Sequence, residues 1–278
     1  MPPLERDDRV LRTTRAVSIV IVPVLTAAFV ILFLFPGQTR TLWGWTIRSR
    51  MSCMFMGGGY LAGALFFARA SRAREWHRLG PGIIATTVFA GALGVATFLH
   101  WPEFNHGHVS FWAWTLLYVT TPLLLPVLYV KNRQFDPGTL GGDDVPIPPW
   151  IRTTMTVLGA GQLLFALTLY LRPSLFLADW PWTLTTISAR SLAAFAAFPA
   201  ITYLAFAFEH RWSALRWPFE TAIAGVTLIA VGAARSSGDF KGGTQSLLWR
   251  AGLIVALAFL IFVWSTMRRE VRRAAGGG

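Results

Sequence analysis

Eight stretches of about 20 apolar residues run through the chain, and they constrain its fold more than any other feature. They lie at roughly 16–35, 51–70, 82–100, 109–130, 152–171, 187–208, 218–234 and 247–266. A helix of this length matches the thickness of a bilayer and satisfies its own backbone hydrogen bonds in lipid. We therefore predict an all-α polytopic membrane protein with eight transmembrane helices.

The charge of the chain supports a membrane location. Only 14% of the 278 residues are charged and the mean hydropathy is +0.50, whereas soluble proteins carry about 25% charged residues. The net charge of +12 could indicate a nucleic-acid partner. If the N-terminus is cytoplasmic, however, 17 of the 25 Lys and Arg residues fall on the cytoplasmic side, as the positive-inside rule requires. We therefore expect both termini in the cytoplasm. We also expect a bacterial plasma (inner) membrane as the location, the bilayer as partner, and no nucleic acid.

The two halves of the chain match each other at an offset of 137 residues. Trp43 aligns with Trp180, Trp45 with Trp182, and Trp112 with Trp249, where chance would align about a quarter of one such pair. We predict two four-helix repeats of the same orientation, related by an approximate two-fold axis along the membrane normal. The first repeat, with its N-terminal tail, is 1–130. A Pro-, Gly- and Asp-rich flexible linker is 131–150, and the second repeat, with its basic C-terminal tail, is 151–278.

A cluster of possible metal ligands lies in the outer loop between the third and fourth stretches. Its members are His100, Glu103, His106 and His108. Imidazole and carboxylate suit Zn, Cu or Fe, so the loop could hold a metal ion or a haem. The alternatives are a pH sensor and an ordinary polar loop. The single cysteine, Cys53, excludes a disulfide or a cysteine-based metal site within the chain.

A Trp-x-Trp element with nearby arginines follows the first and fifth stretches. Its candidate ligand-binding residues are Trp45, Arg48, Arg50, Trp180, Trp182 and Arg190. Guanidinium groups could hold a carboxylate, phosphate or lipid headgroup, with the indoles as apolar walls. The alternative is that Trp anchors at the headgroup level, as it commonly does, and that the Arg side chains extend to the bilayer surface.

The interiors of the stretches carry backbone irregularities and almost no charge. Their central parts contain no Asp, Glu, Lys, Arg or His, which weighs against an ion-coupled pump. Glu220, near the cytoplasmic end of the seventh, is expected in a salt-bridged interfacial cluster. Small residues and prolines interrupt other stretches at Gly57–Gly63, Thr120–Pro122, Pro126 and Gly159–Gln162. Broken helices at a repeat interface are typical of binding sites in transporters, although packing alone also explains them.

Three functions remain open from the sequence. The first is a protein that binds or transports a small molecule or lipid between the two repeats, at a site open to the outer side. The second is a metal- or haem-binding redox or sensor protein, and the third is a structural subunit of a larger membrane complex. The chain has no phosphate-binding loop or nucleophile elbow, so the sequence leans against an enzyme.

Overall fold

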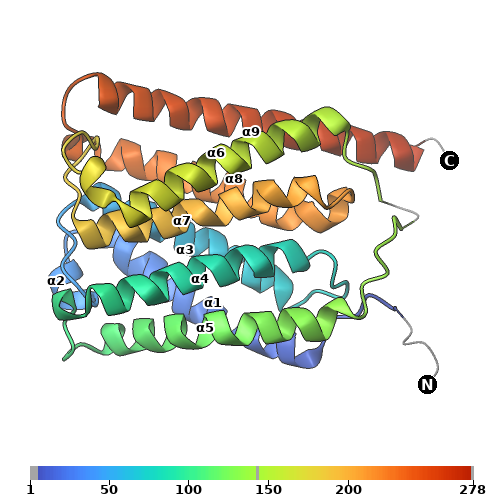
Figure 1. The fold of residues 1–278 in the computed structure, drawn as a ribbon, viewed down its shortest axis with the longest axis horizontal. Helices are drawn as coiled ribbons and strands as arrows, with labels where there is room; N and C mark the ends of the chain where they lie inside the picture. The colour runs from blue at the N-terminus through green and yellow to red at the C-terminus, as the bar shows by residue number, and fades with distance from the viewer. Residues whose placement is uncertain (1–5, 142–143, 277–278) are drawn as a thin grey trace.

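The described part of the chain has eight helices long and apolar enough to cross a membrane, as the sequence predicts. The computed structural model describes residues 6–141 and 144–276; the ends of both tails and two linker residues lie outside that range. The helices are α1 (Arg12–Phe29, continued by a π-helical turn Val30–Leu34), α3 (Arg50–Ala70), α4 (Gly80–Leu99), α5 (Val109–Arg133), α6 (Pro149–Leu171), α7 (Thr186–Leu204), α8 (Trp212–Arg235) and α9 (Thr244–Gly276). They run side by side, and α1 begins at the same end of the bundle where α9 ends (Figure 1). A short helix, α2 (Thr39–Leu42), lies at the opposite end.

Several helices extend beyond the apolar stretches that predict them. The helix α8 begins at Trp212 and carries Pro218 in its second turn, where the apolar stretch only begins. The helix α9 continues through the basic segment after Thr266, with an ion pair between Arg273 and Glu270 one turn apart. The α8 extension, residues 212–217, is interrupted by Ser213 and Arg216, and the α9 extension is rich in arginine. Hydropathy marks the lipid-facing core of a helix and not its hydrogen-bonded ends, which explains the difference.

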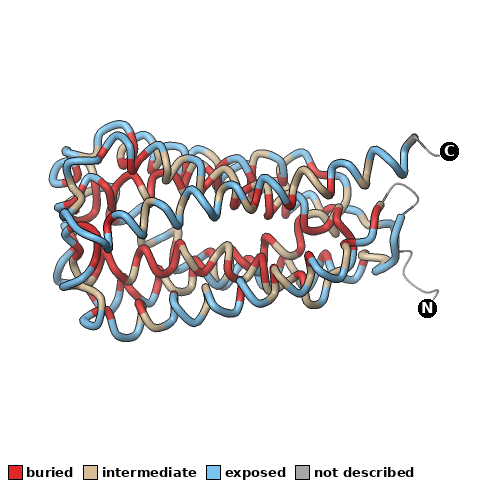
Figure 2. Tube along the Cα trace, turned by 90° about the horizontal axis from the view of Figure 1, so that it is seen from above, coloured by how far each residue is buried: buried red, intermediate tan, exposed pale blue. Residues whose placement is uncertain are grey.

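Four central helices are surrounded by four peripheral ones. Within each half, α1 packs on α3, α4 on α5, α6 on α7 and α8 on α9; across the halves, α3 packs on α8 and α4 on α7. The most apolar window of α3 is 67% buried and that of α9 is only 17% buried. Figure 2 shows this distribution, with buried residues facing the middle of the bundle and exposed ones around its circumference. The peripheral helices therefore present apolar surface to lipid.

Three consecutive glycines place α3 against three different neighbours. Successive residues of a helix point about 100° apart. A Cβ added at Gly57 would lie 2.9 Å from Phe33, one at Gly58 would lie 3.0 Å from Leu228, and one at Gly59 would lie 2.4 Å from the Phe195 ring. The triple glycine thus lets α3 approach the π-helical turn, α8 and α7 at one level. It serves three interfaces and not a single small-residue face.

The helices α4 and α5 make a close backbone contact at Gly94. Both Pro122 and Pro126 lie inside α5, which continues without a break. Proline has no N–H, so Pro122 leaves the Tyr118 carbonyl without its usual helical donor. A Cβ at Gly94 would lie only 2.5 Å from that carbonyl oxygen. Glycine at this position lets α4 lie directly against the carbonyl that the proline frees.

The loops of the two halves make equivalent backbone hydrogen bonds. At the end with the termini, Val10 N–H donates to Arg74 and Ile147 N–H donates to His210; at the other end, Asn105 N–H donates to Gly44 and Lys241 N–H donates to Pro181. Corresponding residues are 136 or 137 apart. The described part of the linker is therefore fixed to the loop between α7 and α8. A flexible connection was expected, but backbone pairing and the polar contacts of Asp136 and Asp144 hold it.

Arg211 joins the linker to the loop between α7 and α8. Its guanidinium donates to Asp136 Oδ1 at 2.7 Å and to Glu209 Oε2 at 2.7 Å, and its side chain is 8% exposed. A second ion-pair group lies about two turns into α8, where Glu220 accepts from Arg216 at 2.9 Å and from Arg69 at 2.7 Å. The salt-bridged interface that the sequence predicts around Glu220 is present.

Candidate functional site: an apolar cavity between the halves

A cavity of about 970 Å³ lies in the middle of the bundle, between the two halves. Each of the eight long helices contributes to its wall, from mid-helix positions such as Tyr60 on α3, Phe89 on α4, Tyr118 on α5 and Phe195 on α7. Among the described residues that line it, none is Asp, Glu, Lys, Arg or His. Such a cavity suits a neutral, mostly apolar molecule, because a charged group here would lose its hydration without gaining a counterion.

The cavity reaches the lipid-facing surface between α6 and α9. Gly161 and Val157 on α6 and Gly252 and Val255 on α9 line it and are exposed. A Cβ built at Gly161 or Gly252 would meet no atom of the described chain within 4 Å. Because α6 packs mainly on α7, and α9 on α8, the space between α6 and α9 forms a lateral mouth toward the bilayer.

The irregular positions of the sequence line this cavity. Gly59, Gly63, Thr121, Gly161 and Gln162 all contribute to its wall. Gly161 has open space beside it, whereas Gly59 and Gly63 let Phe195 and Leu25 pack closely against α3. The polar residues are tolerated because they face a cavity rather than lipid. The amide of Gln162 donates to the carbonyl of Ala196 on α7. Of all the sequence signals, the interrupted helices are the ones that point to this place.

The polar groups of the wall centre on two tyrosines. The hydroxyls of Tyr60 and Tyr118 lie 2.8 Å apart, and both side chains are buried. The hydroxyls of Thr86 and Thr221 instead donate to carbonyls of their own helices. The tyrosine pair, contributed by α3 and α5, is therefore a buried polar feature of the wall, which also contains Tyr203 on α7 and Gln162 on α6.

The Trp-x-Trp elements pack into aromatic clusters and do not line the cavity. Trp45 packs edge-on against Trp114, with ring centroids 4.9 Å apart, and Trp180 packs edge-on against Trp182 at 5.4 Å. The Trp182 indole N–H donates to Ser52 Oγ on α3. These clusters close the end of the bundle that carries α2. Arg48 and Arg50 are exposed there and also lie outside the cavity wall.

Arg190 and His100, from different halves, lie together in a chain of hydrogen bonds. Arg190 Nη1 lies 2.5 Å from His100 Nε2, and His100 Nδ1 lies 2.6 Å from Glu103 Oε1. This arrangement fits a neutral imidazole that accepts from Arg190 and donates to Glu103. Arg190 also donates to the carbonyl of Tyr170. The predicted anion-binding arginine is thus engaged in joining α7 to the end of α4.

The other outer-loop histidines do not join this chain. His108 caps α5, accepting from Ser110 N–H at 3.2 Å, while its Nε2 lies 2.7 Å from the Thr41 carbonyl. The His106 ring lies tilted beside Trp101, with ring centroids 5.1 Å apart. His100, Glu103, His106 and His108 are therefore not gathered as one ligand set, since the ring nitrogens of two of them already have partners. A metal or haem in this loop stays a prediction that needs rearrangement.

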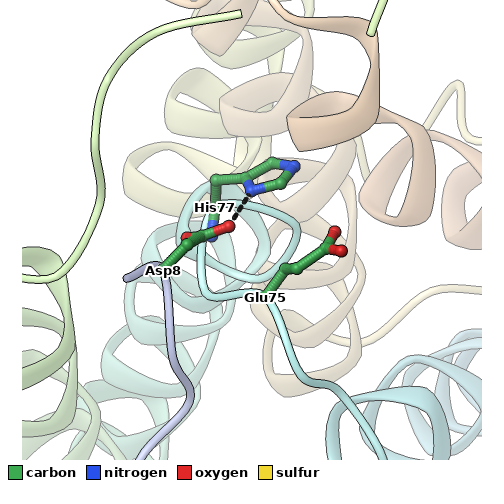
Figure 3. A group of neighbouring side chains, drawn as sticks. All are labelled: Asp8, Glu75 and His77. Atoms are coloured by element: carbon green, nitrogen blue, oxygen red, sulfur yellow. Dashed lines mark hydrogen bonds and ion pairs between the residues drawn. The ribbon is translucent and has the colours of Figure 1, made fainter. Parts of the chain in front are cut away.

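The side chains that do gather as possible metal ligands lie at the opposite end. Within residues 6–141 and 144–276, the group is Asp8, Glu75 and His77, with ligand atoms within 4.8 Å of one another. Figure 3 shows the Asp8 carboxylate bonded to His77, with Glu75 beside them. The Arg78 guanidinium is paired with Glu75, so that carboxylate already has a cationic partner. The sequence did not indicate this group because Asp8 and His77 are far apart in the chain; we interpret it as an attachment of the N-terminal segment to the α3–α4 loop.

A metal titration tests the outer-loop hypothesis. Because the imidazoles of His100 and His108 are already hydrogen-bonded, we expect Zn²⁺ or Cu²⁺ to leave the melting temperature of the purified protein unchanged. Thermal melting with and without each ion measures this. A rise in Tm that disappears in the variant His106→Ala/His108→Ala, but persists in Asp8→Asn, would instead support a metal in this loop.

Comparison with known proteins returns no relative for this arrangement. No protein-family model matches the chain, and no curated protein or solved structure matches it significantly. The fold and the cavity therefore define the class without a family: a multi-pass helical protein of the membrane that encloses an apolar cavity between two groups of helices.

Proposed function

We propose that the protein binds a neutral apolar molecule, a lipid or a lipophilic small molecule, in the cavity between its halves. The observation that carries the proposal is the absence of Asp, Glu, Lys, Arg and His from the described wall of a 970 Å³ cavity. Ligand pockets span about 300–1,000 Å³, so the volume suits a lipid chain and a ring. The ligand enters from the bilayer between α6 and α9, rather than from the outer side that the sequence favoured.

The cavity favours ligand binding over a purely structural role. A subunit that only supports a larger complex gains nothing from an internal space, because each unfilled volume costs packing energy. An anionic ligand held by the outer arginines is also less suited, since Arg190 is engaged with His100 and the Tyr170 carbonyl. A neutral ligand needs none of these groups.

We further propose that the halves are parallel repeats with both termini in the cytoplasm of a bacterium. The offset of 136 or 137 residues between equivalent loop hydrogen bonds supports duplication. The packing of α3 on α8 and of α4 on α7 supports a two-fold relation, because these pairs exchange when the halves exchange. The 17-to-8 distribution of Lys and Arg supports the orientation.

Closing the lateral mouth should abolish binding. We expect Gly161→Trp and Gly252→Trp each to reduce the lipid that co-purifies with the protein by at least about tenfold, because an indole at either position enters open space at the mouth. Native mass spectrometry of protein released from mild detergent measures the bound lipid. The matched control is Leu164→Trp, one turn away on the lipid-facing surface of α6 and outside the cavity wall.

The control Leu164→Trp should retain as much bound lipid as the unaltered protein. Equal occupancy in all three variants would contradict a ligand in this cavity. Unchanged thermal melting of Gly161→Trp and Gly252→Trp confirms that any loss comes from blocking and not from unfolding; a Cβ at either position meets no atom of the described chain within 4 Å.

A further inference from the structure

The tyrosine pair in the cavity has more hydrogen-bond donors than its contact uses. Two phenols carry two O–H hydrogens, and the Tyr60–Tyr118 contact at 2.8 Å uses one of them. Among residues 6–141 and 144–276, neither hydroxyl has another hydrogen-bond partner. One O–H hydrogen therefore remains without an acceptor, in a buried place where leaving it unsatisfied is unfavourable.

The two rings are held by aromatic neighbours. Tyr60 packs edge-on against Phe195, with ring centroids 5.0 Å apart and planes at 88°. Tyr118 lies against Trp114 at 4.4 Å and against Phe89 at 5.9 Å. Both tyrosine side chains are only 2% exposed, so the hydroxyls cannot turn out to water. Packing therefore fixes both hydroxyls in place, and both residues belong to the cavity wall, so the spare donor stays beside the cavity whichever tyrosine carries it.

The surrounding wall restricts what can accept this hydrogen. A charged acceptor is disfavoured, because no cationic side chain among the lining residues would balance it. A neutral carbonyl oxygen accepts one hydrogen bond without a counterion. The rings of Phe89 and Phe195, 4.8 Å apart, flank the tyrosines and offer faces and edges to another flat ring.

We propose that the ligand is a neutral lipid with a carbonyl at its polar end, of the prenylated quinone class. Its carbonyl accepts from the Tyr60–Tyr118 pair, its ring lies among the phenylalanines, and its chain extends toward the mouth between α6 and α9. This assignment rests on the proposed function, since it names the occupant of the same cavity.

Matched probes separate the carbonyl from the apolar framework. The purified protein in lipid nanodiscs is titrated with 2-decyl-1,4-naphthoquinone and with 2-decylnaphthalene, which has the same rings and chain but no oxygen. We expect the quinone to bind about 3- to 10-fold more tightly, as one net hydrogen bond of about 0.5–1.5 kcal/mol provides. Methyl laurate, a carbonyl on an open chain, is expected to bind more weakly than the quinone because it lacks the ring.

The decisive variant is Tyr60→Phe/Tyr118→Phe. Replacing both partners of a hydrogen bond by apolar groups of the same shape can be nearly neutral for stability, so the variant should fold. It should bind 2-decylnaphthalene as the unaltered protein does and lose its preference for the quinone. Tyr129→Phe, outside the cavity wall, should keep that preference.

Each outcome has a distinct meaning. If the preference survives in Tyr60→Phe/Tyr118→Phe but disappears in Tyr203→Phe, the polar end lies on α7 and the proposal is wrong. If both naphthalene probes bind equally to the unaltered protein and Gly161→Trp blocks both, the cavity binds apolar ligands but the carbonyl assignment fails. If neither probe binds, the proposed function itself fails.

Discussion

Arg211→Leu is expected to destabilise the protein by about 3 kcal/mol near neutral pH. Breaking a buried ion pair by removing one partner costs about 3–5 kcal/mol. The low end applies here because the side chains of Asp136 and Glu209 keep about a fifth of their exposure. The variant leaves two carboxylates close together without their shared cation. The free energy of unfolding in mixed micelles, obtained by SDS titration, measures the loss.

The pH dependence identifies the charges as the cause. Burial alone would raise the pKa of Asp136 and of Glu209, but hydrogen bonds from Arg211 outweigh burial and lower both. A lowered folded-state pKa stabilises the protein above the unfolded value of about 4, and that contribution is lost as the pH falls through the folded pKa. The difference between the unaltered protein and Arg211→Leu should therefore be largest near pH 7 and shrink below about pH 4.

A surface ion pair provides the control for Arg211. Arg273 pairs with Glu270 on α9, and its side chain is 75% exposed. Exposed pairs contribute about 0–1 kcal/mol, so Arg273→Leu should leave the free energy of unfolding nearly unchanged at every pH. A difference between Arg211→Leu and the unaltered protein that stays constant from pH 7 to pH 3.5 would contradict the charge explanation and indicate lost packing.

Local sequence patterns predicted the helices because the length of an apolar stretch is set by the bilayer. The same patterns could not place helix ends such as Trp212, because the first turn of α8 lies outside that stretch. Side-chain contacts between the two halves depend on how segments far apart in the sequence pack together. Arg190 and His100 were both singled out in the sequence, yet their contact joins positions 90 residues apart and removes both from the ligand-binding role expected of them.

In the sequence, glycines inside the helices indicated the cavity, whereas the tyrosines of its wall did not. Gly59 and Gly161 attract attention in a sequence because glycine is unfavourable inside a helix, and both line the cavity. Tyr60 and Tyr118 carry no local signal, since a tyrosine in an apolar stretch is ordinary. Their pairing depends on how α3 and α5 are placed around α4, which one sequence does not specify.

Gly94→Ala and Gly91→Ala should change stability in opposite directions, although both place a methyl group on the face of α4 that meets α5. A Cβ at Gly94 would lie 2.5 Å from the backbone oxygen of Tyr118, which cannot rotate away, so the helices must separate. Overpacking of this kind costs about 1–3 kcal/mol. At Gly91 the nearest atom is Pro122 Cβ at 3.8 Å, an ordinary contact, and alanine gains up to about 1 kcal/mol of helix propensity.

The two variants also test whether α5 fixes the tyrosine pair. Moving the Tyr118 backbone away from α4 should displace its hydroxyl from Tyr60. Gly94→Ala should therefore weaken binding of 2-decyl-1,4-naphthoquinone more than binding of 2-decylnaphthalene, whereas Gly91→Ala should alter neither. Thermal melting and probe titration of the two proteins side by side measure both effects. Equal Tm values for Gly94→Ala and Gly91→Ala would show that α4 does not lie against the carbonyl that Pro122 leaves free, and the close contact between these helices would have to be abandoned.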